Sequence, residues 1–343
     1  MTGRKIRNME EFAEVSGISR PTVSKYFNDP DSVRKSTRAR IESALEQYDY
    51  RPNIFAINQN RKLTKNIGIV VPYLADPFFA EIARNLEMLV IAAGYHPILL
   101  SSHGSTAQEN DNFESLRAIK PAGALLAPLG RASDKAAVER FCKAVPSVLF
   151  DSYISGMGEA FVGHDNIQAT KLICEYLCRT GQPPAFFEMR TPTNPNAYRR
   201  RNAYCEAMER LGHPVQLLQA EGGGWDFEKI GLEGGTKVIE ERSLTTDTIL
   251  CSNDRLAIGF LAAAYQKGLR VGLGAGAALR VAGHDDHPFS RYTCPPLTTV
   301  SQDYTAIAER SVERLFSLVE SGERAENRDE IFFEGKLVMR QSA

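Results

Sequence analysis

The chain has two parts that differ in the periodicity of their apolar and polar positions. From residue 66 onward, apolar runs of four to six residues alternate with longer segments whose apolar residues recur at helical spacing. Short buried strands that alternate with amphipathic helices are typical of parallel sheets joined by right-handed crossovers. Before residue 50, only helical spacing is present. The pattern therefore predicts an α/β body of two Rossmann-like lobes that follows an all-α head.

The alternation also predicts the individual elements of the body. Strands are expected at residues 67–72, 97–100, 123–127, 147–150, 184–188, 215–219, 247–251 and 279–283. Helices are expected at 77–94, 107–119, 133–143, 166–179, 197–211, 228–241 and 254–267. The tail adds an extended segment at 297–301, a helix at 305–321 and an alternating strand at 332–339. Because the pattern restarts after residue 161, the two lobes are expected to share one design.

Helix-ending residues divide the start of the chain into short helices. Asn8 can cap a first helix, and Glu11, three residues later, completes a capping box. Gly17 suits the left-handed end of that helix. Ser19 can cap a second helix, which accepts Pro21 in its first turn. Two short helices joined through a glycine form a helix-turn-helix.

The second of these helices has a polar face that suits nucleic acid. This face carries cations and short hydroxyl side chains, namely Arg20, Thr22, Ser24 and Lys25. Such groups at a helix N-terminus can contact phosphates and base edges in a major groove. An ordinary αα-hairpin with solvated charges would show the same spacing, so this stretch alone leaves both alternatives open. A third helix, at roughly residues 34–48, is expected to close the head.

The distribution of charge favours the nucleic-acid alternative. Residues 1–65 hold 13 Lys and Arg against 8 Asp and Glu, a net charge of +5, whereas the remainder holds 28 against 34, a net charge of −6. A basic head on an acidic body places the contact with a polyanion at the N-terminus. The chain has no apolar run near 18 residues and no secretory leader, so we expect a cytoplasmic protein. The six cysteines lack paired spacing and are expected to be reduced and mostly buried.

A family resemblance rests on the residues of the head. The stretch VSGISRPTVSKYFN resembles the helix-turn-helix of the lactose repressor (LacI/GalR) family, and the likeness continues almost to the C-terminus. It implies a ligand-responsive transcription regulator, expected to be a repressor and not an enzyme, that binds a palindromic operator as a homodimer. It also implies a head at residues 1–50, a hinge at 51–65 and a periplasmic-binding-protein-like body at 66–343. The expected lobes of that body, joined by three crossing strands, are about 66–160 with 290–343, and about 161–289.

The resemblance also indicates which residues contact DNA. In the family, the hinge is a helix that inserts a leucine into the minor groove, and Gln59 occupies that position here. Pro21 lies where family members often contact bases, and because proline has no donor to offer, base selectivity is expected to depend on Arg20. The full set of expected DNA contacts is Arg20, Pro21, Thr22, Ser24, Lys25, Asn28, Ala56 and Gln59.

A second set of residues is expected to bind the effector. Open α/β sheets bind ligands at the carboxyl ends of their strands, and several residues in such loops also match family motifs for ligand contact. Carboxylate, amide and guanidinium groups can exchange hydrogen bonds with a polar ligand, and aromatic rings can stack on its apolar face. The expected residues are Phe78, Phe79, Asp151, Arg200, Trp225, Asn253 and Asp285, with Arg200 foremost. The effector is expected to be a sugar, a sugar acid or a nucleobase.

Neighbouring polar residues have simpler explanations. Asp165 and Asp254 are expected to be helix N-caps. Gly272–Gly276 resembles a dinucleotide-binding fingerprint but follows a helix and precedes a strand, so we expect a loop. The run 284–287, which reads HDDH, resembles a metal cluster, but consecutive residues do not converge easily on one ion. No metal or cofactor is therefore expected. A sugar receptor or enzyme whose basic head serves another partner remains the alternative function.

Glutamine at position 59, where the family has a leucine, predicts a weaker bend in the operator DNA. Glutamine can hydrogen-bond to minor-groove acceptors, but it cannot replace an apolar wedge between base pairs. We therefore expect this protein to bend its operator less than a leucine-bearing relative does. A gel-based bending assay on both proteins measures this, and equal bend angles would contradict it.

Overall fold

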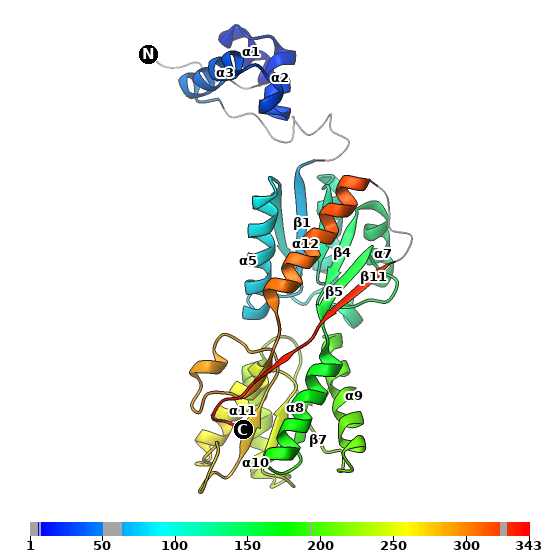
Figure 1. The fold of residues 1–343 in the computed structure, drawn as a ribbon, viewed down its shortest axis with the longest axis vertical. Helices are drawn as coiled ribbons and strands as arrows, with labels where there is room; N and C mark the ends of the chain where they lie inside the picture. Colours follow the sequence, from blue (N-terminus) through cyan, green and yellow to red (C-terminus); the bar gives the residue numbers. More distant parts are fainter. Residues whose placement is uncertain (1–5, 7, 51–63, 193, 323–327) are drawn as a thin grey trace. The chain divides into compact units, whose positions relative to one another are not determined.

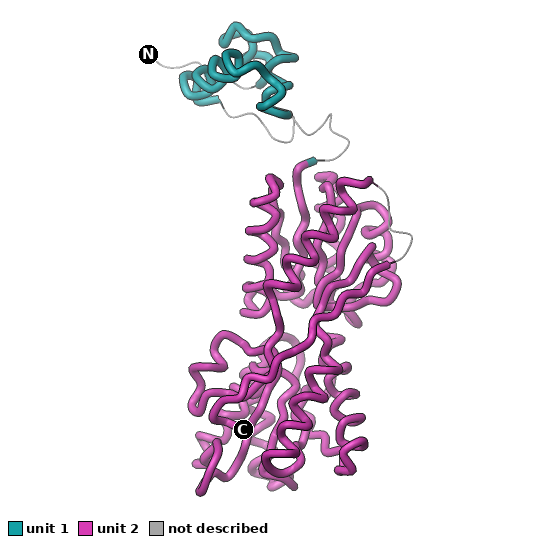
Figure 2. The backbone as a smooth tube through the Cα atoms, in the orientation of Figure 1, with its two compact units in different colours: residues 1–64 teal, residues 65–343 magenta. Residues whose placement is uncertain are grey.

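The computed structural model describes residues 6, 8–50, 64–192, 194–322 and 328–343. The chain forms two compact units, residues 1–64 and residues 65–343, which Figure 2 colours separately. Within the described ranges, no helix combines the length and the apolar character that a membrane span requires. Residues 51–63 of the expected hinge, with the predicted DNA contacts Ala56 and Gln59, lie outside the described residues.

The head is a small helical unit. Its described elements are α1 (Met9–Ser16), α2 (Arg20–Asn28), the 3-10 turn η1 (Pro30–Ser32) and α3 (Lys35–Tyr48). The predicted caps of α1 are confirmed, because Asn8 Oδ1 accepts a hydrogen bond from the Glu11 backbone N–H at 2.9 Å and Gly17 has φ = 63°. The prediction for Ser19 is wrong in detail. Ser19 occupies the N-cap position of α2, but its hydroxyl lies 2.8 Å from the Thr22 hydroxyl and makes no capping hydrogen bond.

The three helices of the head share a small core. Phe12, Val23 and Ile41, one from each helix, are fully buried against one another. Tyr50 closes this core, since its ring stacks on that of Phe12 with centroids 4.8 Å apart. The apolar side of α2 therefore faces inward, which leaves its polar side for solvent or a partner.

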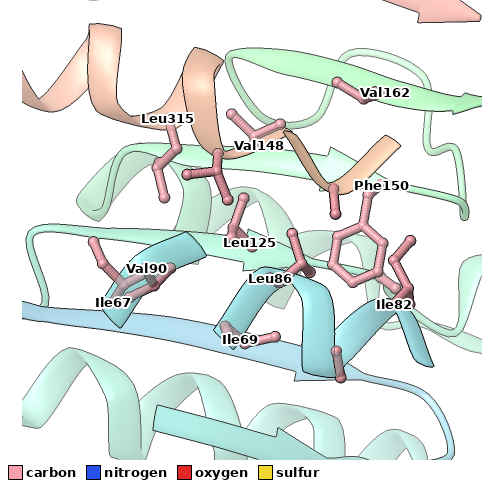
Figure 3. Close-up of a cluster of buried hydrophobic side chains, with 14 of the residues drawn as sticks. Ile67, Ile69, Ile82, Leu86, Val90, Leu125, Val148, Phe150, Val162 and Leu315 are labelled. Atoms are coloured by element: carbon pink, nitrogen blue, oxygen red, sulfur yellow. The ribbon is translucent and has the colours of Figure 1, made fainter. Parts of the chain in front are cut away.

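The first lobe of the body is a parallel sheet covered by helices on both faces. Its strands, in the spatial order β11-β5-β4-β3-β1-β2, are β11 (Asp329–Phe333), β5 (Ala160–His164), β4 (Ser147–Phe150), β3 (Gly123–Leu126), β1 (Asn66–Val71) and β2 (His96–Ser101). Its helices are α5 (Pro77–Ala92), α6 (Thr106–Ala118), α7 (Lys135–Ala144) and α12 (Tyr304–Ser321). Figure 3 shows the core on one face, where Leu86 of α5 and Leu315 of α12 approach Leu125 and Val148 of the sheet.

The second lobe repeats this design with a smaller sheet. Its parallel strands, in the order β7-β6-β8-β9, are β7 (Leu217–Ala220), β6 (Ala185–Met189), β8 (Thr248–Cys251) and β9 (Arg280–Ala282). Its helices are α8 (Asn166–Thr180), α9 (Pro195–Arg210), α10 (Phe227–Glu240) and α11 (Asp254–Gln266). The predicted α/β body of two lobes is confirmed, and the strands and helices predicted between residues 67 and 283 are observed to within a few residues.

The chain crosses between the lobes near the expected places, but the strands at the crossings differ from the prediction, and residues such as Leu297, Val300 and Ala343 pack in the second lobe although 290–343 was expected in the first. β5 was not predicted, and it joins the first sheet before the chain enters α8. The tail expected as one strand at 332–339 is instead two strands. β11 pairs with β5, whereas β12 (Lys336–Val338) pairs antiparallel with β10 (Thr299–Ser301). Figure 1 shows this red segment running from the first lobe into the second, where Ala343 is buried in the core.

The cysteines are less buried than expected. All six have free thiols. Cys142, Cys174 and Cys251 are buried, two others are half-buried, and Cys294 is exposed. Burial raises the pKa of Cys142 to about 11, so this thiol stays protonated at neutral pH.

Two glycines let α10 and α11 approach closely. A Cβ atom added to Gly259 would lie 2.2 Å from the Glu228 carbonyl oxygen and 2.6 Å from the Leu232 nitrogen. A Cβ atom added to Gly231 would lie 2.3 Å from the Leu256 carbonyl oxygen. Because these neighbours are backbone atoms, no side-chain rotation relieves the overlap. The spacing of α10 and α11, and with it the start of α11, therefore depends on both glycines.

Gly259→Ala should destabilise the body. The added methyl group forces the two helices apart, and we expect the free energy of unfolding to fall by about 3 kcal/mol, at the upper end for overpacked cores. Urea unfolding followed by the fluorescence of Trp225, the only tryptophan, measures this. Gly223→Ala is the control, since Gly223 has no atom within 4 Å of an added Cβ. Equal unfolding curves for the two variants would contradict the argument.

Candidate functional site

The head presents the predicted DNA-contacting residues on α2. Arg20, Pro21 and Lys25 are exposed, and Thr22 and Ser24 are half-exposed. Among the described residues, neither Arg20 nor Lys25 forms an ion pair, whereas Arg38 of α3 pairs with Asp31 at 2.6 Å and with Glu42 at 3.0 Å. The α2 cations are therefore available to an external anion, and the Arg38 cation is already engaged.

The body contains a cavity between its lobes that unites the second set of predicted residues. All seven line it, namely Phe78, Phe79, Asp151, Arg200, Trp225, Asn253 and Asp285. The first-lobe residues follow β1 and β4, and the second-lobe residues follow β6, β7, β8 and β9. Side chains that are separate in the sequence meet here because the carboxyl ends of the strands in both sheets face one another.

Asp151 forms one wall of the cavity on the first-lobe side. It is 4% exposed and has a left-handed backbone with φ = 54°. Asn196 of α9 donates one amide hydrogen bond to the Asp151 Oδ1 atom at 2.9 Å and another to its carbonyl oxygen at 3.2 Å. Its Oδ2 atom is buried without a hydrogen-bond partner in the described structure. Burial, with smaller contributions from the charges of Asp285 and Asp76, raises the pKa of Asp151 to about 7.

Arg200 lies on the second-lobe side and is held by three different partners. Its Nε atom donates to Asn166 Oδ1 at 2.7 Å, its Nη1 atom to the Ser252 carbonyl oxygen at 2.7 Å, and its Nη2 atom to Asp285 Oδ1 at 2.5 Å. Gln302 also donates to Asp285 Oδ1 at 2.7 Å. Arg200 therefore fixes the position of Asp285, and each of its nitrogens already donates to a protein oxygen.

Arg255 connects the two lobes. Its Nη1 atom lies 2.8 Å from Asp76 Oδ2 of the first lobe, and its Nε and Nη2 atoms donate to the Glu228 carboxylate of its own lobe at 2.7 and 2.6 Å. Asp76 also caps α5 by accepting from the Phe78 backbone N–H. Burial raises the pKa of Asp76, and Arg255 opposes that shift. This buried ion pair resists separation of the lobes on this side of the cavity.

Aromatic rings supply the apolar part of the lining. Trp225 stacks on Tyr73 of the first lobe with centroids 5.5 Å apart and an interplanar angle of 13°. Phe79 lies edge-on to Trp225 and is 2% exposed, so it belongs mainly to the first-lobe core. Phe78 is half-exposed and lies edge-on to Phe79 and Tyr304. Phe78 is therefore more accessible than Phe79 to a ligand in the cavity.

The structure adds polar residues that the sequence analysis missed. They are Asn196, Arg255, His287 and Gln302, all of which line the cavity. Asn196 lies one helical turn before Arg200, a spacing that places both on one face of α9 and could have identified it. Gln302 directly follows β10, so the rule that ligands bind at strand ends also pointed to it. Arg255 lies in the first turn of α11, after β8, and His287 lies five residues after β9, so the same rule indicated these two residues less directly.

The predicted role of Asp254 is wrong. Asn253 is the N-cap of α11, since its Oδ1 atom accepts from the Leu256 backbone N–H at 2.8 Å. Asp254 is instead fully buried and accepts hydrogen bonds from the Thr299 and Ser290 hydroxyls at 2.7 and 2.6 Å. Asp165, in contrast, caps α8 as predicted. Asn253 thus combines a capping role with its place in the cavity wall.

The other two motifs have structural roles. Residues 272–276 form a loop between α11 and β9, as predicted. The side chains of the HDDH run diverge. Asp285 turns to Arg200, and Asp286 pairs with Arg340 at 2.6 Å. His284 is 1% exposed, and burial lowers its pKa well below the usual value, so this imidazole is neutral.

Comparisons with known proteins place two domains along the chain. Residues 8–53 match the family described as bacterial regulatory proteins, lacI family. Residues 176–343 match the family described as periplasmic binding protein-like domain. These matches cover the helical head and most of the second lobe with the C-terminal tail.

Curated relatives match along nearly the whole length. The NTD biosynthesis operon regulator NtdR of Bacillus subtilis is 26% identical over 340 residues, covering 97% of this chain and 99% of the relative. The transcriptional repressor PurR of Pasteurella multocida is 25% identical, with 97% and 98% covered. The transcriptional repressor CytR of Escherichia coli is 27% identical, with 86% and 84% covered. These similarities extend over both units of the chain.

Solved structures support the same architecture. The lac repressor dimer bound to operator and the anti-inducer ONPF superposes with a TM-score of 0.83 at 24% identity, with 99% of each chain covered. The transcriptional regulator CelR in complex with cellobiose superposes with a TM-score of 0.68 at 21% identity, with 98% of this chain and 100% of that chain covered. At these identities the likeness concerns the fold.

A double-mutant cycle tests the ion pair between the lobes. Asp76→Asn keeps a capping side chain on α5 but removes the charge, whereas Arg255→Ala leaves Asp76 buried without its cation. We expect Arg255→Ala to lower the free energy of unfolding by about 3 kcal/mol, because an unpaired buried charge is costly. The two substitutions should be coupled by about 1 to 3 kcal/mol, which denaturant unfolding of the four proteins measures.

The surface pair Arg84–Glu81 provides a matched control. These two residues also form an arginine–carboxylate pair, at 2.6 Å, but their side chains are 57% and 39% exposed. Because water screens exposed pairs, the same cycle with Glu81→Gln and Arg84→Ala should show no measurable coupling. Additive effects at Asp76 and Arg255 would show that their contact does not hold the lobes together.

Proposed function

Since the chain belongs to the lactose repressor (LacI/GalR) family of bacterial regulatory proteins, we propose that its head binds a palindromic operator as a homodimer and represses transcription. It is a DNA-binding regulator that responds to a small molecule, and we assign the cavity between the lobes as the site of that response. The observation that carries this proposal is that Arg20 and Lys25 of α2 form no ion pair with the described residues, in a head that matches the lacI family of bacterial regulatory proteins.

The polar face of α2 would read half of the operator. Its side chains have the chemistry that a major groove requires, because Arg20 can donate a planar fork to a base edge and Lys25 can contact a phosphate. Thr22 and Ser24 would position the helix on the backbone. Pro21 presents no donor, so discrimination between bases would depend on Arg20. The assignments of Asn28, Ala56 and Gln59 follow from the family resemblance.

The cavity would bind a small polar effector. The relatives of this chain include the ribose operon repressor of Escherichia coli and the repressors PurR and CytR. These relatives favour a sugar, a sugar acid or a nucleobase as the chemical class of the effector. The lining combines carboxylates, amides and aromatic rings, the groups that such ligands require. The relatives are transcription regulators, and we propose that this chain likewise catalyses no reaction.

Effector binding would act through the crossing segments. Gln302 lines the cavity and directly follows β10, on a segment that carries the chain between the lobes, so a change in lobe closure at the cavity would also move this segment. The effector can change operator affinity only by its difference in affinity for the two closure states, commonly about 1 to 3 kcal/mol. In a homodimer, the change in lobe closure of both bodies would determine whether the two heads can bind the two half-sites of the operator at the same time.

A salt series with duplex DNA tests the proposed function. Binding to a fragment of the protein's own promoter region should weaken steeply with salt, because each phosphate contact releases counterions. Lys25→Ala should lower the affinity and reduce the slope of log K against log salt by about 1, and Arg20→Ala should reduce the preference for operator over random duplex. Arg84→Ala, which removes an exposed arginine of the body, should change neither. If the unaltered protein showed no salt-dependent association with any duplex, the proposal would fail.

A further inference from the structure

The buried polar atoms of cavity-lining residues that have no hydrogen-bond partner in the described structure are mostly acceptors. Four lining residues, each at most 7% exposed, have a buried polar atom without a partner in the described structure. These atoms are Asp151 Oδ2, Asn196 Oδ1, Gln302 Oε1 and His287 Nε2. A buried polar group that has lost its hydrogen bonds to water and gained no partner costs free energy. Each of these atoms therefore favours a ligand that supplies the missing hydrogen bond.

The hydrogen bonds already present fix which atom is the acceptor in each amide. Asn196 Nδ2 donates to Asp151, and Gln302 Nε2 donates to Asp285. Because both partners are carboxylate oxygens, which accept hydrogen bonds, the amide nitrogen must be the atom that faces them. The remaining atom of each side chain is therefore an oxygen. The same logic makes His287 a donor, since its Nδ1 atom accepts from the Phe289 backbone N–H and the proton resides on Nε2.

Among the described residues that line the cavity, none offers an unengaged cation to an acidic ligand. Arg200 is paired with Asp285, and Arg255 is paired with Asp76 and Glu228. Every nitrogen of both guanidinium groups donates to a protein oxygen. A carboxylate or phosphate on the ligand would compete with these protein carboxylates and would lie near Asp151. Anionic ligands are therefore disfavoured.

Asp151 is the lining carboxylate that lacks a cation. Asp76 and Asp285 each have an arginine within 2.8 Å, whereas the partner of Asp151 is the neutral amide of Asn196. Among the charges around Asp151, that of Arg200 has the largest effect and lowers its pKa, Asp285 and Asp76 raise it, and Arg199 lowers it less. Burial raises the pKa of Asp151 to about 7 in the absence of a ligand, which is the response of a carboxylate that needs positive charge nearby.

We propose that the effector is an amino polyol whose protonated amine binds Asp151 Oδ2 and whose hydroxyl groups donate to Asn196 Oδ1 and Gln302 Oε1. A ring or ether oxygen of the same ligand accepts from His287 Nε2. The apolar side of the carbon skeleton lies against Phe78, the more accessible of the two adjacent phenylalanines. This inference rests on the proposed role of the cavity as the effector site. Of the three proposed classes of effector, namely a sugar, a sugar acid and a nucleobase, it selects a sugar-like polyol and adds a cationic group.

Matched sets of ligands test the charge preference. Glucosamine, glucose and glucuronate share a pyranose ring, and glucamine, glucitol and gluconate share a linear six-carbon chain. Titration calorimetry and thermal shift on the full-length protein at pH 7 compare their binding. We expect the amine in at least one set to bind at least tenfold more tightly than the neutral member, and neither acid to bind. The proposal is overturned if an acid binds more tightly than its amine, if amine and neutral member bind equally in both sets, or if neither amine binds.

Asp151→Asn separates the charge from the shape of the site. Asparagine tolerates the left-handed backbone at this position, and its amide oxygen can still accept from Asn196. The ratio of amine affinity to neutral-member affinity should fall at least tenfold, because the substitution removes the charge that distinguishes the two ligands. Asp134→Asn is the control, because Asp134 caps α7 away from the cavity and asparagine preserves that cap. An unchanged ratio in Asp151→Asn, with a normal melting temperature, would contradict the proposed contact.

Operator binding, measured on the same samples, distinguishes this inference from the proposed function. An acidic ligand that changed operator affinity would overturn the amine assignment and leave the regulatory function standing. An amine that bound at Asp151 without any change in operator affinity would support the ligand class and contradict the regulatory role of the cavity.

Discussion

The geometry of the cavity depends on one buried carboxylate at the start of α11. Asp254 accepts hydrogen bonds from the Thr299 and Ser290 hydroxyls and from the His287 backbone N–H, so it ties α11 to the segments that follow β9 and lead into β10. A Cβ atom at position 283 would lie 2.2 Å from Asp254 Oδ1, so this contact requires Gly283. Burial raises the pKa of Asp254 to about 8, and its hydroxyl partners can donate or accept, which accommodates either protonation state. Because the cavity-lining residues on both sides of Asp254 move with it, a single internal network positions much of the second-lobe wall.

The walls that this network positions are electrostatically unequal. The second lobe supplies both guanidinium groups of the cavity and neutralises Arg200 with its own Asp285. The first lobe supplies Asp76 and Asp151, of which only Asp76 receives a cation from across the cavity. Closure therefore gives Asp76 a cation, whereas it buries Asp151 with only the neutral amide of Asn196 as its partner. A ligand that brings positive charge to Asp151 supplies what the protein itself does not, and for that reason its binding would favour the closed arrangement over an open one.

Local patterns were sufficient to predict most elements of the body and the residues at the ends of its strands. Strand and helix periodicity, caps such as Asn8, and the rule that ligands bind at the carboxyl ends of strands all depend on residues close together in the sequence. Long-range features were not predictable in this way. Arg255 and Asp76 are 179 positions apart, and nothing local indicates that they meet. Asp254 was misassigned because two adjacent residues could each cap α11. Asn253 accepts the capping hydrogen bond, whereas Asp254 accepts a hydrogen bond from Thr299, which is distant in the sequence.

The ion pairs of Arg255 suggest why the lobes can respond to a small ligand. Two of its nitrogens bind Glu228 of the same lobe, and only one binds Asp76 of the first lobe. When the lobes separate, Arg255 keeps its bidentate partner, so no guanidinium is left uncompensated, and Asp76 regains water as it becomes exposed. Opening then costs this ion pair, the hydrogen bonds from Asn196 to Asp151 and the contact of Trp225 with Tyr73, rather than the exposure of a hydrophobic core. Because both lobes have separate cores that stay intact, the two states differ by few interactions. A ligand that adds two or three buried hydrogen bonds, each worth about 0.5 to 1.5 kcal/mol, is sufficient to change their balance.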